Sequence, residues 1–145
     1  MPDQHPIVKA ALRWCDALNT SADAAFNRAT LDHDVGAIDY AAFTRALRDK
    51  GKVLAACLDI TTNASSALLA VAEADLGGIR EATNSLSTAI DRIKLVQDAV
   101  SLLGELAVAA VALSVAVAAP TPASLAAAAA ALGKAGKRVA SKIGD

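Results

Sequence analysis

Aromatic residues, cysteine and proline are all rare in this chain of 145 residues. Aromatic residues make up 3% of it, and there are two cysteines and four prolines. Because Ile, Tyr, Phe and Trp are scarce, the composition disfavours a β-rich fold. Two cysteines also cannot build the disulfide framework of a small secreted domain. Hydrophobic residues, nearly half of them alanine, nevertheless make up 54% of the chain, and so apolar a chain is expected to fold.

Acidic residues are almost absent from the C-terminal part of the chain. Residues 1–105 carry 10 Lys or Arg and 14 Asp or Glu, whereas residues 106–145 carry four cations and a single acid, Asp145. The net charge of −1 provides no overall field that would attract nucleic acid. We therefore expect one helical domain over 1–145, with amphipathic helices over 1–105 and an apolar hairpin with a basic end over 106–145.

Apolar residues recur at steps of three and four along the chain, which indicates α-helices. The pattern predicts a first helix from near Pro6 and a second from an N-cap at Asp39 to about Asp75, with a weak point at 61–63. A third helix is expected to follow Gly77-Gly78 and to continue to Ala119. The expected fold class is all-α, an antiparallel bundle of about four helices, the second and third of them long, with a C-terminal apolar helical hairpin.

The longest apolar run lies between Glu105 and Pro120. Residues 106–119 read LAVAAVALSVAVAA, with Ser114 as the only polar side chain, and such a helix must be hidden from water. Fourteen residues cover about 21 Å, which is short of the ~30 Å hydrocarbon core of a membrane. The run is followed by a Pro-Thr-Pro turn, in which Thr121 can cap a new helix, and by an alanine-rich return. In composition this hairpin resembles the one that pore-forming colicins hide inside a soluble helical bundle.

Two functions fit this hairpin. In the first, a non-enzymatic, toxin-like or effector-like protein stores the hairpin and inserts it into, or docks it on, a membrane. In the second, a soluble interaction module (an adaptor, immunity protein or oligomeric scaffold) uses the same residues as core or interface. The expected partners are membrane lipid or a partner helix, and we expect a homo-oligomer. The candidate residues are Leu106, Val108, Val111, Leu113, Val115, Val117, Lys134, Lys137, Arg138 and Lys142.

Little in the sequence supports catalysis. His5 and His33 lie far apart, and no common catalytic, zinc or phosphate-loop motif occurs. The segment from Asp32 to Phe43 resembles an EF-hand loop, but Ala42 stands where the bidentate glutamate belongs, so an ordinary capped turn explains it. We expect no enzyme activity, cofactor, metal, nucleic acid or small-molecule substrate. The N-terminus lacks a secretory signal, which predicts cytoplasmic synthesis, with release by a specialised secretion system as an alternative. The alanine-rich composition suggests a bacterial source.

The two cysteines are placed symmetrically about the first predicted turn. Gly36 lies midway between Cys15 and Cys57, so an antiparallel helical pair would bring the two sulfurs to the same height. Packed helix axes lie about 8–10 Å apart, whereas a disulfide needs Cα atoms within roughly 7 Å. A disulfide and two buried free thiols are both compatible with the sequence, and buried free thiols are the commoner arrangement.

Overall fold

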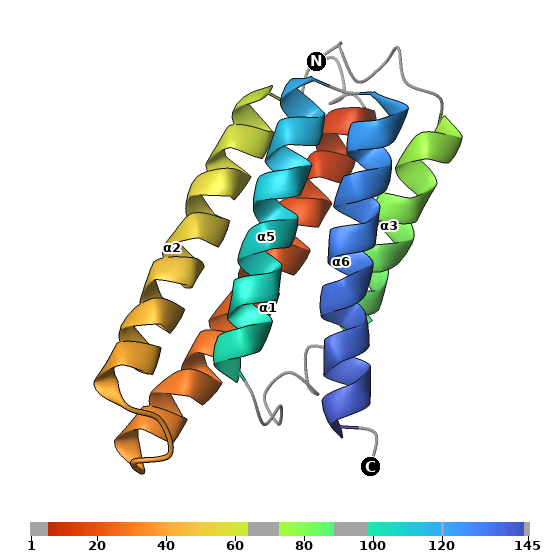
Figure 1. Ribbon diagram of the computed structural model, residues 1–145. Coiled ribbons are helices and arrows are strands. Elements are labelled where there is room, and N and C mark those ends of the chain that lie inside the picture. Colours follow the sequence, from red (N-terminus) through yellow and green to blue (C-terminus); the bar gives the residue numbers. More distant parts are fainter. Residues whose placement is uncertain (1–5, 64–72, 89–98, 120, 144–145) are drawn as a thin grey trace.

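The protein is an antiparallel bundle of helices in the computed structural model, which describes residues 6–63, 73–88, 99–119 and 121–143 (Figure 1). Successive described helices run in alternating directions along the bundle (Figure 1). This arrangement confirms the predicted all-α class. The described helices are α1 (Pro6–Asp34), α2 (Tyr40–Asn63), α3 (Glu73–Thr88), α5 (Ala99–Ala118) and α6 (Pro122–Ile143).

The turn between α1 and α2 is closed by local hydrogen bonds. Gly36 has φ = 79°, a left-handed conformation that glycine adopts without steric cost. The backbone N–H of Ala37 donates to the carbonyl of Asp32 over 2.7 Å. At the start of α2, Asp39 Oδ1 accepts from the N–H of Ala42 at 2.8 Å, which confirms the predicted N-cap.

The turn between α5 and α6 is also capped as predicted. The N–H of Ser124 donates to Thr121 Oγ1, and the N–H of Thr121 donates to Ser124 Oγ, both at 3.0 Å. The two bonds form a reciprocal cap that satisfies backbone donors at the start of a helix. Pro122 is the first residue of α6, where its missing N–H has no consequence.

The middle of the chain differs from the expectation. One helix was expected from residue 79 to Ala119, but α3 and α5 are separate and run in opposite directions (Figure 1). Residues 89–98, which connect the two helices, lie outside the described residues. Gly77-Gly78 was expected to interrupt the helices, yet both residues lie inside α3, because a helical glycine costs only about 1 kcal/mol relative to alanine. Asp75, the expected end of the second helix, belongs to α3.

Helix α5 contributes more fully buried leucines to the core than any other described helix. It packs against α1, α2 and α6, and in Figure 1 α2 and α6 lie on either side of it. Its leucines Leu102, Leu103, Leu106 and Leu113 are fully buried. The alanines between them let neighbouring helices approach closely, which is how a chain with few large side chains reaches the density of a folded core.

We expect the two faces of α5 to respond differently to truncation. Leu113→Ala removes a fully buried side chain and should lower the free energy of unfolding by about 3 kcal/mol. Val115→Ala, on the exposed face, should change it by less than about 1 kcal/mol. Urea denaturation of both variants measures the difference, and equal losses would contradict this burial pattern.

Candidate functional site

One side of α5 is uncovered, and it is apolar. Val108, Val111 and Val115 are 64%, 47% and 57% exposed, and their spacing of three and four residues places them on one helical face. The other predicted apolar site residues, Leu106, Leu113 and Val117, are buried in the core. The structure therefore divides the predicted set into a core half and a surface half.

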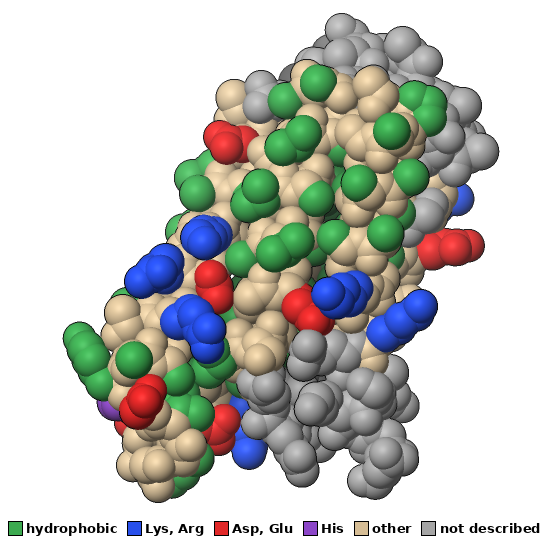
Figure 2. Space-filling view, in the orientation of Figure 1, with side chains coloured by type: hydrophobic (Ala, Val, Ile, Leu, Met, Phe, Trp, Pro, Cys, Tyr) green, Lys and Arg blue, Asp and Glu red, His purple; other side chains and the backbone are tan. Residues whose placement is uncertain are grey.

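Helix α6 extends this apolar surface. It packs beside α5, and its alanines 123, 126, 127 and 130 are exposed. We call the three exposed valines and these four alanines the α5–α6 face. Figure 2 shows hydrophobic side chains spread over α5 and the adjoining part of α6, with charged side chains mainly beyond them. The face is flat and built from small side chains, which suits contact with a second helix or with lipid.

Cations lie beside the α5–α6 face. Lys134 and Lys137 are exposed on α6, one and two turns beyond Ala130. Arg138 and Lys142 also belong to α6, but their side chains lie outside the described part of the structure. In Figure 2, Lys and Arg side chains flank α5 on both its α2 side and its α6 side.

The cations on the α2 side were missed by the sequence analysis. Arg45, Arg48 and Lys52 are exposed, and their spacing of three and four residues places them along one side of α2. Lys52 lines the same groove as Val108 and Val111, which ties this side of α2 to the α5–α6 face. The helical spacing was visible in the sequence, but the packing of α2 against α5 was not.

The groove between α2 and α5 is shallow and mostly apolar. It has a volume of about 410 Å³, and five of its seven lining residues are glycine, alanine or valine. The two polar residues, Asp49 and Lys52, form an ion pair with Nζ and Oδ1 3.9 Å apart. Asp49 is nearly buried, so the lysine offsets part of the charge of a carboxylate that solvent scarcely reaches.

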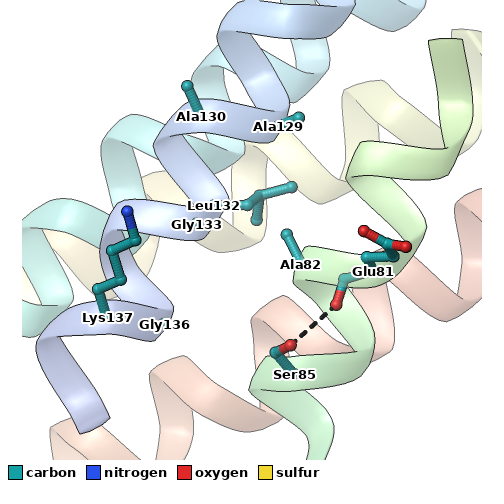
Figure 3. A pocket seen from close by; sticks show the side chains of 9 residues that line it. All are labelled: Glu81, Ala82, Ser85, Ala129, Ala130, Leu132, Gly133, Gly136 and Lys137. Atoms are coloured by element: carbon teal, nitrogen blue, oxygen red, sulfur yellow. Dashed lines mark hydrogen bonds between the residues drawn. The ribbon is translucent and has the colours of Figure 1, made fainter.

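A second groove lies between α3 and α6 (Figure 3). Its volume is about 600 Å³, and small residues such as Ala82, Gly133 and Gly136 line it. The Ser85 hydroxyl donates to the backbone carbonyl of Glu81 at 3.0 Å, and Lys137 lies at the opposite side of the groove (Figure 3). Glu81, Ser85 and Lys137 are the polar residues among the small side chains of its lining.

The segment that resembles a calcium loop serves structural roles. Asp32 Oδ1 lies 3.3 Å from Arg28 Nε, and Asp39 caps α2. His33 stacks on Phe43 with ring centroids 4.7 Å apart. Within the described ranges, no three His, Cys, Asp or Glu side chains come together as a metal site would require. Asp32, His33 and Asp39 thus each have a structural partner in this turn.

The comparisons with known proteins add no relative. No protein family, no curated protein and no solved structure matches this chain.

We expect alanine to be accepted at the centre of the α2–α5 groove. A Cβ at Gly104 would lie 3.6 Å from Asp49 Oδ2, an ordinary contact, so Gly104→Ala should raise the free energy of unfolding by roughly 0.5–1 kcal/mol. Gly36→Ala is the control, because a φ of 79° strains alanine. This variant should lower the free energy of unfolding by about 1 kcal/mol. Urea denaturation measures both. A loss of stability in Gly104→Ala would show that α2 and α5 pack more closely than described.

Proposed function

We propose that the protein binds anionic membrane surfaces through the α5–α6 face and then delivers the α5–α6 hairpin into the bilayer. The observation that carries the proposal is the exposure of Val108, Val111 and Val115 on α5. Among the described residues, α5 is the one helix that is long and apolar enough to cross a membrane. Core helices of soluble proteins share that composition, so the exposed valines, and not the composition, support the proposal.

Docking would remove the exposed apolar side chains from water. Full burial of a valine is worth about 1.5–3 kcal/mol, and each of the three is roughly half exposed. Lipid contact would therefore gain on the order of 3 kcal/mol from the valines together. Lys134 and Lys137 would each add about 1 kcal/mol near anionic headgroups. Apolar contact and charge attraction are thus of similar size, and binding should require both.

Insertion has a different requirement, because α5 must leave the core. Its 20 residues span about 30 Å, which matches the hydrocarbon core. Its buried leucines would exchange contacts with α1 and α2 for contacts with lipid tails, which are as apolar as leucine. Glu105 is the seventh of the 20 residues of α5 and lies about 5 Å from the centre of the helix, so insertion must also bear the cost of a carboxyl group near the middle of the bilayer.

We expect serine at the three valines to abolish vesicle binding. The triple variant Val108→Ser/Val111→Ser/Val115→Ser removes most of the apolar contribution, so sedimentation with phosphatidylglycerol-containing vesicles should show at least a tenfold loss of bound protein. The matched control is Leu47→Ser/Leu54→Ser/Leu58→Ser, which changes three exposed leucines of α2 outside the α5–α6 face. Release of an entrapped dye measures insertion separately from binding.

A charge variant tests how much the cations of α6 contribute to vesicle binding. Lys134→Gln/Lys137→Gln removes about 2 kcal/mol of headgroup attraction, a loss of roughly 30-fold in affinity. Arg13→Gln, on an exposed position of α1, should leave binding unchanged. If wild-type protein neither binds anionic vesicles nor releases dye from them at neutral or acidic pH, the proposed membrane function is wrong. If it binds without dye release, docking stands and insertion fails.

A second candidate function rests on the outer side of α2. Leu47, Leu54 and Leu58 are all more than half exposed, and their spacing of seven and four residues aligns them in a narrow stripe. Lys52 lies five positions after Leu47, which corresponds to a rotation of about 140° around the helix axis. The leucine stripe therefore points away from the groove beside α5. A leucine stripe of this kind suits the apolar side of another helix, and the soluble interaction module that it favours would be an oligomer of this chain.

This candidate predicts self-association that depends on the α2 stripe. Wild-type protein should sediment as a dimer or larger species at micromolar concentration, and Leu54→Glu should shift it to monomer by placing a charge in the interface. Val111→Glu serves as the matched change on the α5–α6 face and should leave the mass unchanged. Analytical ultracentrifugation measures the mass, and a monomeric wild type would eliminate this candidate.

A further inference from the structure

Cys15 and Cys57 face each other across the α1–α2 pair. The Cys15 thiol lies 3.6 Å from the carbonyl oxygen of Cys57, and the Cys57 thiol lies 3.9 Å from the carbonyl oxygen of Cys15. Both thiols are free and buried. Each sulfur thus reaches the backbone of the opposite residue, which requires the two helices to lie close together at this level.

Small residues explain this close approach. Ala11 and Ala22 lie four and seven residues from Cys15 on the same side of α1, and both are buried. Ala56, beside Cys57 on α2, is buried as well. Alanine at such positions lets helix axes come nearer than the usual separation, which relieves the distance constraint that normally prevents a disulfide between packed helices.

We propose that Cys15 and Cys57 are a redox modification site, at which a small-molecule disulfide such as oxidised glutathione converts the two thiols to one disulfide joining α1 to α2. In the first step, the Cys57 thiolate attacks one glutathione sulfur and releases one glutathione thiolate. In the second, the Cys15 thiolate attacks the Cys57 sulfur of the mixed disulfide and releases the other glutathione. Two protein thiols are oxidised, one glutathione disulfide is reduced, and the two protons pass to the released thiolates.

The two thiols make equivalent contacts with the opposite backbone, so the proposed order of the two steps follows the hydrogen bond between the thiols. A hydrogen bond from the Cys15 thiol stabilises the Cys57 thiolate and lowers the pKa of Cys57. The same hydrogen bond, together with burial, raises the pKa of Cys15. Cys57 is therefore the attacking thiol and Cys15 the resolving one. Because both are buried, the first step needs a local opening of the α1–α2 pair, whereas the second joins sulfurs that are already neighbours.

The bond would close a loop between residues that are 42 positions apart. Closing such a loop restricts the unfolded chain and should raise the midpoint of thermal unfolding by roughly 10 °C. The disulfide would cross-link α1 to α2, and no such cross-link would join α5 or α6 to them. This inference does not depend on the proposed membrane function.

The folded protein incubated with oxidised glutathione should lose both free thiols and about 2 Da of mass as the two hydrogens leave. Its unfolding midpoint should rise, and dithiothreitol should reverse all three changes. Cys15→Ala should stop at a mixed disulfide on Cys57, and it should form this adduct faster than Cys57→Ala forms one on Cys15, because Cys57 is the attacking thiol. The urea-unfolded chain in the same buffer is the control for the oxidant.

Four results would overturn the proposal. They are two glutathione adducts per chain, a covalent dimer, a lower unfolding midpoint after oxidation, and thiols that persist in the folded protein while the unfolded chain oxidises.

Discussion

Helix α5 is apolar on every side beyond Glu105, but the helices around it cover only part of its circumference. Its leucines fill the space between α1, α2 and α6, and these contacts form the centre of the core. The uncovered part carries Val108, Val111 and Val115. The described helices thus leave one apolar side of α5 in contact with water. The membrane proposal depends on what covers this side of α5. The self-association proposal depends on what covers the exposed leucines of α2.

The scarcity of large side chains shapes the rest of the bundle. A core rich in alanine gains less from burial per residue than one rich in leucine or phenylalanine, so it must bring backbones together to reach normal packing density. The α1–α2 pair shows the result, since each cysteine sulfur lies within 4 Å of the opposite backbone carbonyl. Close axes also leave shallow grooves at the surface, such as those beside α5 and between α3 and α6.

Helix ends were predictable where a specific side chain makes them. Asp39 and Thr121 both accept hydrogen bonds from the first turn of the following helix, and this capping chemistry can be read directly from residue type. Glycine was a poorer guide, because Gly36 has a positive φ whereas Gly77 and Gly78 lie inside α3. The reversal between α3 and α5 was missed because apolar residues continue at helical spacing through it. Periodicity reports local helix and does not report chain direction.

The candidate site was predictable in residue type and not in arrangement. The apolar run was evident, but apolar residues on all sides of a helix give no preferred direction, so the sequence could not separate Leu113, which is buried, from Val111, which is exposed. Only the packing of the neighbouring helices decides which of these two side chains is buried. The cations of α2 were missed for the same reason, since Arg48 and Lys52 matter to the site only once α2 is known to lie beside α5.

In the proposed membrane function, docking of the α5–α6 face and release of the α5–α6 hairpin from the core would be separate steps. Docking uses side chains that already face water, so it leaves the contacts of α5 with α1 and α2 intact. Release would transfer Leu106 and Leu113 to lipid at little hydrophobic loss, but it would also uncover the sides of α1 and α2 that pack against α5. The barrier to release therefore lies in the helices left behind and not in the hairpin. In the proposed membrane function, a surface that lowers this barrier would have to offer those helices apolar contact as well, so α1 and α2 would lie at the interface once α5 had entered the bilayer.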